Sequence, residues 1–383
     1  MARDPNDITA YRKSKRARDN FLRLVILGII ISAIFLILTS GEDVFAPFQK
    51  LGTRLESEGF PITLSGSASY SMNRFGANFL LLSDTYLYTY TDNGGKIFDV
   101  RHNYERPFQK ATDRRILLYN LNGYEFSLFN RNGMVYEEKL DDKIVLAELG
   151  NNDMAAIVTN SAAFSNILYV FDSNGRWRYR KRFIEEEVNA VTFAGRNNEL
   201  FVATSVVVNG EIFSRVYRLR TDTDDDYLIW EQTLPADSWA LNLRENGDRL
   251  TVLADNAMFT LDADSGEIIG RYEFNAGRLV QPVFGESFNL VILSDYVTRR
   301  TLYVTLDADS RLISTEIMPF EVKKVEIFGE MVYTLTGSFI FVHDKSLAEV
   351  RNFDFEDEYW DFQMTDGGAL LLGYDTIELE SVK

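Results

Sequence analysis

The chain has 383 residues, with 40 Lys and Arg against 57 Asp and Glu and a formal net charge of −17. This acidic balance argues against nucleic-acid binding, which requires a basic surface. There is no cysteine, and the two histidines are His102 and His343. Disulfides, thiolate metal sites and thiol nucleophiles are therefore excluded, and the sequence nominates no metal ligands, no cofactor and no catalytic motif.

Residues 1–20 form a short basic tail with six Lys and Arg residues and three Asp, which give a net charge of +3. Residues 21–40 follow, with an uninterrupted apolar run from 24 to 38 that Phe21 and Leu22 extend past Arg23. At about 1.5 Å per residue this segment nearly crosses a hydrocarbon core of about 30 Å. We therefore expect a transmembrane signal anchor over 21–40.

A cleaved signal peptide is the alternative, but its apolar core is normally about 7–15 residues long and ends at a small-x-small site. Thr39-Ser40-Gly41 matches such a site poorly. The outer flank begins with Glu42 and Asp43, so the positive-inside rule leaves the basic tail in the cytoplasm. We expect a single-pass protein of the cell membrane with an extracytoplasmic domain. Because the tail and Arg23 carry +4 of the total −17, residues 24–383 carry −21.

Residues 41–59 form a linker between the membrane and the rest of the chain. Pro47 suits the first turn of a helix, and Phe48, Leu51 and Leu55 fall on one helical face. The linker is therefore expected to contain a short juxtamembrane helix.

Residues 60–383 repeat one pattern eight times: an apolar strand that ends in a small or polar residue, a second strand, and a polar turn. The ends of the apolar strands are 38 to 50 residues apart and lie at Asp84, Asn122, Asn160, Ser205, Asp255, Asp295, Gly337 and Asp375. Turns rich in Asp, Asn and Gly follow, as in residues 169–176 and 259–267. A period near forty made of short strands is typical of an all-β β-propeller with one four-stranded sheet per blade.

The eighth repeat is incomplete, since residues 376–383 suffice for one more strand only. The missing outer strand has a candidate at residues 61–66, which would complete the last blade and close the ring. Eight blades are therefore expected. The alternative is seven closed blades, with residues 60–66 as linker.

Three turns between the second and third strands of a blade are longer than the others, at residues 160–166, 205–215 and 295–301 in blades three, four and six. Aromatic and Arg side chains on such turns are typical of binding hot spots. The alternative is that these segments are extended hairpins that pack on themselves. The candidate binding residues are Phe164, Val207, Val208, Phe213, Tyr296, Arg299 and Arg300.

The acidic run from Asp222 to Asp226 begins like a calcium-binding loop. However, Tyr227 occupies the place of the required Gly, and Thr233 stands where the loop needs its terminal Glu. A solvated hairpin turn is the main interpretation, and weak calcium binding the alternative. Asp262, Asp264 and Gly266 form a similar turn.

Parts of the repeats resemble those of quinoprotein-like (PQQ-like) propellers, which place a Trp after an Asp- and Gly-containing turn. The resemblance is carried by residues 261–268, residues 169–177 and Trp230. Enzymes of that group use a vicinal-cysteine disulfide, which is impossible here, and a bound calcium. The chain also resembles a family of membrane-anchored propeller proteins of Gram-positive bacteria with no assigned activity. Outer-membrane assembly lipoproteins with this fold are scaffolds, but this chain differs from them in being acidic, cysteine-free and helix-anchored.

The resulting hypothesis is a non-enzymatic, membrane-anchored scaffold that binds a protein or a cell-envelope polymer. One alternative is a hydrolase or lyase that acts on envelope carbohydrate through paired carboxylates in the central channel. Another is an extracellular ligand-sensing domain. Clustered channel carboxylates would favour the enzyme.

Overall fold

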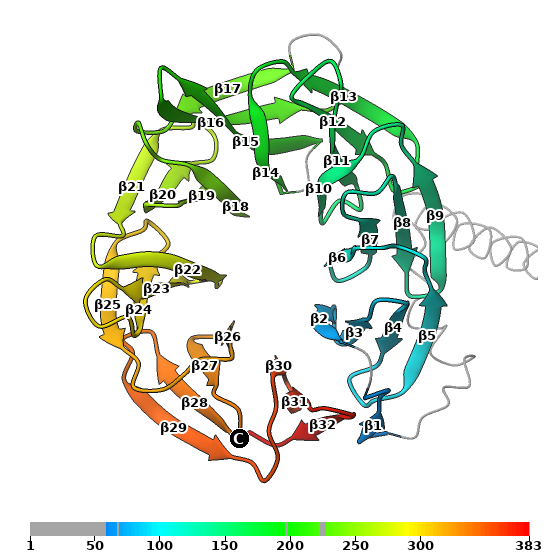
Figure 1. The fold of residues 1–383 in the computed structure, drawn as a ribbon, viewed down its shortest axis with the longest axis vertical. Helices are drawn as coiled ribbons and strands as arrows, with labels where there is room; N and C mark the ends of the chain where they lie inside the picture. The colour runs from blue at the N-terminus through cyan, green and yellow to red at the C-terminus, as the bar shows by residue number, and fades with distance from the viewer. Residues whose placement is uncertain (1–58, 67–68, 196–197, 223–226, 383) are drawn as a thin grey trace, which may run out of the picture. The chain divides into compact units, whose positions relative to one another are not determined.

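The computed structural model describes residues 59–382 apart from 67–68, 196–197 and 223–226. Eight antiparallel four-stranded sheets are arranged around a ring (Figure 1). The prediction of eight blades is confirmed, and the seven-blade alternative is wrong. The predicted tail, transmembrane segment and juxtamembrane helix lie outside the described residues, except that the linker's last residue is described. Within the described part, no helix is long and apolar enough to cross a membrane.

Each blade consists of four consecutive strands, ordered from the centre of the ring outward, except that blade eight takes its outermost strand from the start of the propeller. The strands are, for blade one, β2 (Ser71–Phe75), β3 (Asn78–Leu82), β4 (Tyr86–Tyr90) and β5 (Lys96–Arg101); for blade two, β6 (Pro107–Ala111), β7 (Ile116–Asn120), β8 (Glu125–Asn130) and β9 (Gly133–Lys139); for blade three, β10 (Ile144–Leu149), β11 (Ala155–Asn160), β12 (Asn166–Phe171) and β13 (Trp177–Phe183); for blade four, β14 (Glu187–Phe193), β15 (Glu199–Val208), β16 (Glu211–Arg220) and β17 (Leu228–Thr233). The remaining strands are, for blade five, β18 (Ala240–Asn246), β19 (Arg249–Ala254), β20 (Ala257–Asp262) and β21 (Ile268–Glu273); for blade six, β22 (Gly277–Phe284), β23 (Phe288–Asp295), β24 (Thr301–Asp307) and β25 (Leu312–Ile317); for blade seven, β26 (Lys324–Phe328), β27 (Met331–Leu335), β28 (Phe339–Asp344) and β29 (Glu349–Asp354); and for blade eight, β30 (Asp361–Thr365), β31 (Gly368–Leu372), β32 (Thr376–Glu380) and β1 (Ile62–Thr63).

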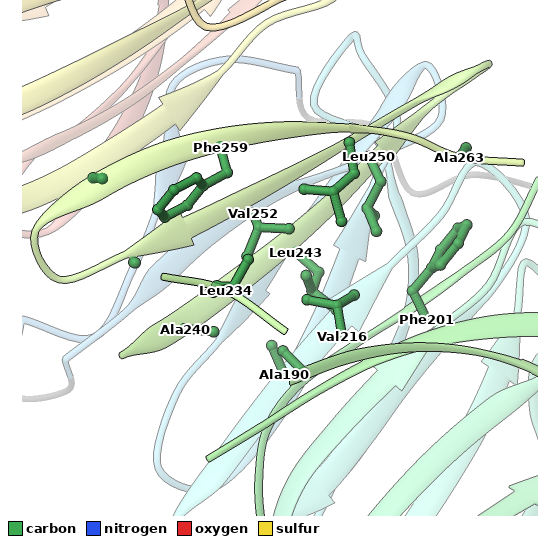
Figure 2. Close-up of a cluster of buried hydrophobic side chains, with 14 of the residues drawn as sticks. Ala190, Phe201, Val216, Leu234, Ala240, Leu243, Leu250, Val252, Phe259 and Ala263 are labelled. Carbon is green, nitrogen blue, oxygen red and sulfur yellow. The ribbon is translucent and has the colours of Figure 1, made fainter. Parts of the chain in front are cut away.

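The core lies between the blades, in clusters of buried side chains from neighbouring sheets. In the cluster between blades four and five, Ala190 and Ala240 come from the innermost strands, where the sheets converge. Phe201 and Phe259 come from strands further out (Figure 2). All four side chains are buried. At this contact the sheets diverge from the ring centre, and the small inner and large outer residues fill the space between them.

Aromatic residues of the outer strands dock on glycines of the next blade. The Trp230 indole of blade four donates a hydrogen bond to the carbonyl of Ala263 (3.0 Å) and covers Gly266, where an added Cβ would lie 2.7 Å from the ring. Tyr136 of blade two covers Gly175 of blade three in the same way, at 2.9 Å. The Asp- and Gly-containing turns thus also lock neighbouring blades together. Trp177 does not dock, because its indole donates to the Tyr179 carbonyl of its own strand and remains exposed.

The ring closes where the two ends of the propeller pair. Ile62 pairs with Ile377 and Thr63 with Thr376, and the Leu64 amide donates to the Asp375 carbonyl. The predicted closing strand is thus confirmed, although only Ile62 and Thr63 have strand geometry. The first described residues, Gly59 and Phe60, lie beside Gly94 of blade one.

The antiparallel strand order gives the ring two unlike faces. One face carries the turns between second and third strands and the connections from blade to blade, and we call it the crossover face. The opposite face carries the remaining turns, among them the turn of Gly94. The chain therefore enters the propeller at the opposite face.

We predict that Ile377→Ala opens the closure. Ile377 is fully buried against blade one, so truncation should lower the free energy of unfolding by about 2–5 kcal/mol. Ile269→Ala is the control, because Ile269 is partly exposed on the outer strand β21, and it should cost less than about 1 kcal/mol. Urea unfolding followed by tryptophan fluorescence measures both. Equal losses would contradict a special role of the seam.

Candidate functional site

The blade-three segment is a compact turn beside the connection to blade four. The Arg182 guanidinium lies over the Phe164 ring at 5.3 Å, which leaves Phe164 only partly exposed. The Ser165 hydroxyl donates to the Ile184 carbonyl at 3.1 Å. These contacts fix the turn against Arg182 and Ile184.

The blade-four segment, for which the sequence left a long binding turn and an extended hairpin open, is an extended hairpin. β15 and β16 pair from Glu199↔Arg220 to Val208↔Glu211, and only Asn209 and Gly210 remain as the turn. Both have positive φ, 54° and 88°, as a type I′ turn requires. The extended-hairpin alternative is therefore right for this blade. Val207 and Val208 are exposed near its tip, whereas Phe213 is partly buried.

The blade-six segment is a true turn that one carboxylate organises. Oδ1 of Asp295 accepts hydrogen bonds from the amides of Val297 and Thr298 and from the Thr298 hydroxyl. The bonds from Thr298, followed by that from Val297, lower the pKa of Asp295. Tyr296, Arg299 and Arg300 are all exposed. The turn is thus pre-ordered, with its side chains directed to solvent.

Exposed large apolar side chains lie in the turns, blade connections and adjoining strand ends of the crossover face, whereas on the opposite face they lie at the starts of outer strands such as Trp177 and Leu228. Of the 21 large hydrophobic residues that are exposed in the described part, ten lie on outermost strands, two (Phe108 and Val280) on innermost strands, and none in a turn of the opposite face. The other nine form what we call the crossover-face apolar set: Ile184, Val207, Val208, Trp239, Tyr296, Val297, Phe339, Trp360 and Tyr374.

Sequence reasoning missed several members of this set. Trp239 is 44% exposed in the connection between blades four and five, between the two candidate segments of blades four and six. The sequence does contain a signal for it, because this Trp directly follows the turn-forming residues Asp237 and Ser238. The structure brings the blade-three and blade-four segments together and places the blade-six turn two blades away.

A groove of about 370 Å³ lies where the blade-three and blade-four segments meet. The residues that line it come from the blade-three turn, the connection between blades three and four, the first residue of β14, and the part of β15 where the hairpin begins. They are Ser165, Glu185, Glu187, Ser205, Val206 and Val207. It is therefore an open, partly acidic groove on the crossover face.

Carboxylates do meet at the centre of the ring, at the seam between blades seven, eight and one. Glu326 of β26 accepts a hydrogen bond from the Met364 amide of β30 (2.9 Å) and lies 3.5 Å from the Arg74 guanidinium of β2. Asp361 of β30 accepts from the Met72 amide of β2 (3.3 Å) and pairs with Lys324 of β26. Each acid thus joins two different blades.

Burial raises the pKa of Glu326, although the Met364 amide, Arg74 and Lys324 all favour its ionised form. The buried carboxamide oxygen of Gln363 lies in the same lining and has no hydrogen-bond partner in the described part. The chemistry of the cluster is that of a clamp, because both carboxylates are already bonded to a cation and a backbone amide.

The other acidic and histidine positions are accounted for locally. Oδ1 of Asp262 accepts from the amides of Asp264 and Ser265 and from the Ser265 hydroxyl, so it stabilises its own turn. The run from 223 to 226 lies outside the described residues. Both histidines are buried, which lowers their pKa. His343 lies within strand β28.

A model of a family of unknown function, DUF5711, matches residues 57–372. The chain belongs to this family. No curated protein matches the sequence significantly. Because no function is assigned to the DUF5711 family, membership indicates no activity for this chain.

Solved structures of other propellers are similar to this DUF5711 chain. BamB from Moraxella catarrhalis is 9% identical, with a TM-score of 0.57 over 85% of this chain and 98% of that one. The C-terminal WD40 domain of Sif2 is 10% identical, with a TM-score of 0.58 over 85% and 99%. Chaetomium thermophilum Sqt1, bound to the N-terminus of ribosomal protein L10, is 11% identical, with a TM-score of 0.53 over 82% and 92%. At such identities the likeness establishes the fold alone, and the membrane anchor and quinoprotein-like repeats stay predictions.

We predict that Glu326 makes the stability of the ring depend on pH. A raised pKa in the folded state stabilises the fold below the ordinary value of 4.5, and this contribution is lost as pH rises through the raised pKa. Glu326→Gln is neutral throughout, so its stability relative to the wild type should rise with pH from about 4.5 upward. Urea midpoints measured across this range test the effect. Glu321→Gln, an exposed surface change, should give a flat difference, and a flat difference for Glu326→Gln as well would contradict the assignment.

Proposed function

We propose that this protein is a non-enzymatic scaffold, anchored in the cell membrane by residues 21–40 and exported, that binds another protein through its crossover face. The single observation that carries the proposal is the crossover-face apolar set, because no exposed large hydrophobic residue lies in a described turn of the opposite face. Exposed apolar side chains that gather on one surface are typical of protein-interaction sites. Large aromatic side chains such as Trp239 and Tyr296 are the usual anchors.

The face at which the chain enters the propeller supports binding through the crossover face. Gly59 and Phe60 arrive at the opposite face, beside the turn of Gly94. A tether at that face leaves the crossover face free for a partner. The Sqt1 structure shows that a propeller of similar fold binds a terminal segment of another protein, and we propose the same class of ligand here.

The carbohydrate-active alternative has a specific site to consider, the seam carboxylates Glu326 and Asp361. Such enzymes need one carboxylic acid and one free carboxylate on either side of a sugar bond. Both seam acids are instead committed to a cation and to a backbone amide of a neighbouring blade. We therefore favour the scaffold, with the acids as a structural clamp.

We predict that Trp239→Ala weakens partner capture more than any change on an outer strand. Removing an exposed anchor should cost about 2 kcal/mol of binding with little effect on the melting temperature. Trp177→Ala is the matched control, since Trp177 is 56% exposed but lies on β13. In-cell photo-crosslinking from position 296, followed by mass spectrometry, measures capture. Loss of crosslinks with both variants, or with neither, would count against the crossover face.

We predict that the propeller is outside the membrane and the tail inside. The chain has no cysteine, so a single introduced thiol reports its own compartment. Asn132→Cys, on an exposed turn of blade two, should react with a membrane-impermeant maleimide in intact cells. Ala10→Cys should react only after lysis. The reverse pattern would overturn the proposed topology.

A further inference from the structure

The sheet of blade four has one open edge that its neighbours lack. β14 pairs with β15 only as far as Glu187↔Ser205, whereas β15 and β16 pair on to Val208↔Glu211. Residues 206–208 therefore have a partner strand on one side only. Unpaired strand edges are templates for pairing with another chain.

The geometry of the hairpin shows which backbone groups are free. In a two-residue hairpin the pair that flanks the turn is hydrogen-bonded, so the next pair, Val207↔Ile212, is not. The amide and carbonyl of Val207 therefore point away from β16. On the other strand, the Ile212 carbonyl already accepts a hydrogen bond from the Asp237 amide at 3.0 Å. One edge of the hairpin is thus covered, and the β15 edge is open.

The open edge borders the groove described above. Val206 and Val207 form one wall, and Ser165 and the connection after blade three form the other. The Ser165–Ile184 hydrogen bond holds that second wall in place. The groove is therefore bounded on one side by the free edge of a strand.

The groove is acidic because of how three consecutive glutamates are directed. Glu186 accepts hydrogen bonds from the Thr204 hydroxyl, the Arg215 guanidinium (2.7 Å) and the Tyr217 hydroxyl. Glu185 and Glu187 are exposed, and neither side chain has an ion-pair or hydrogen-bond partner among the described residues. Two uncompensated carboxylates therefore line the groove, on a chain whose residues 24–383 carry −21. This charge would steer a cationic partner towards it.

We propose that this groove binds an extended, basic segment of a partner protein, which adds as a strand to the open edge of β15. Backbone hydrogen bonds at Val207 would hold the segment, and Lys or Arg side chains at alternate positions would face Glu185 and Glu187. The inference rests on the proposed scaffold function and names the chemistry of its ligand.

The test uses full-length protein in detergent micelles and a fluorescent decapeptide of alternating Lys and Val, measured by anisotropy. We expect it to bind, and to bind more weakly as salt is added. An alternating Glu–Val decapeptide should not bind. The double variant Glu185→Gln/Glu187→Gln should lower the affinity about tenfold, because two charge-assisted contacts are lost. The control Glu321→Gln/Glu356→Gln removes two exposed acids from other blade connections and should leave affinity unchanged.

A second pair of variants isolates strand addition from charge. Val207→Pro removes the outward amide without touching the β15–β16 hydrogen bonds, and should weaken binding about tenfold. Ile212→Pro changes the opposite residue of the same pair on the covered edge, and should have little effect. As a measurement independent of protein folding, a Lys–Val peptide N-methylated at alternate backbone amides should bind the wild type poorly, because it keeps its charges but cannot pair.

Equal binding of the Glu–Val peptide, equal effects of the two proline variants, or full binding of the methylated peptide would each overturn the inference. The scaffold function has its own readout in the crosslinks from position 296. Persistent crosslinks without binding of the Lys–Val peptide would refute the groove and leave the scaffold standing. Loss of both would refute both.

Discussion

The pairing of Ile62 and Thr63 with Thr376 and Ile377 is the constraint on which the rest of the ring depends. Each blade buries its apolar faces only against its two neighbours, so an open ring would leave two blade faces in water. The closing strand gives blade eight its fourth strand and joins the two ends of a fold built from local hairpins. Glu326 and Asp361 act at the same seam, since each joins β26, β30 and β2 through one cation and one amide. A cation and a backbone amide at each carboxylate offset part of the cost of burying it.

The geometry of the ring also limits the size of the side chains at the contacts between blades. Between blades four and five, where the two sheets converge on the ring centre, Ala190 lies on the innermost strand and Phe201 on a strand further out. At the rim, Trp230 can cover Gly266 only because that position has no side chain, and Gly266 also has a positive φ of 77° that suits its turn. The glycine therefore serves the turn and the blade contact at once. Gly175, which has a positive φ of 79° and lies under Tyr136, has the same dual use.

The sequence was sufficient for the fold wherever the signal is local and periodic. Apolar second strands, polar turns and a spacing near forty residues predict the blades, and the incomplete last repeat predicts the closing strand. The blade-four segment was left open between a binding turn and an extended hairpin, because Val206 to Val208 and Ile212 to Phe213 are apolar in a loop as well as in a strand. The Asn209-Gly210 pair is the local signal that favours the hairpin. The seam could not be predicted, because Arg74, Glu326 and Asp361 come from different repeats and no spacing relates them. The sequence likewise could not show that Tyr136 packs on Gly175 of the next blade while Trp177 stays exposed, because such contacts depend on the geometry between blades.

In the proposed function, the two faces of the ring have different roles: the chain enters at the opposite face, and the partner binds at the crossover face. The chain arrives beside Gly94 on the opposite face, where no exposed large hydrophobic residue occupies a described turn. The crossover face presents Trp239 and Tyr296, and it holds the Tyr296 turn in place through Asp295. Side chains on a pre-ordered turn lose little conformational freedom on binding, so more of their contact energy remains as affinity. A closed ring can therefore hold binding elements two blades apart in fixed relation, which a single flexible loop could not do.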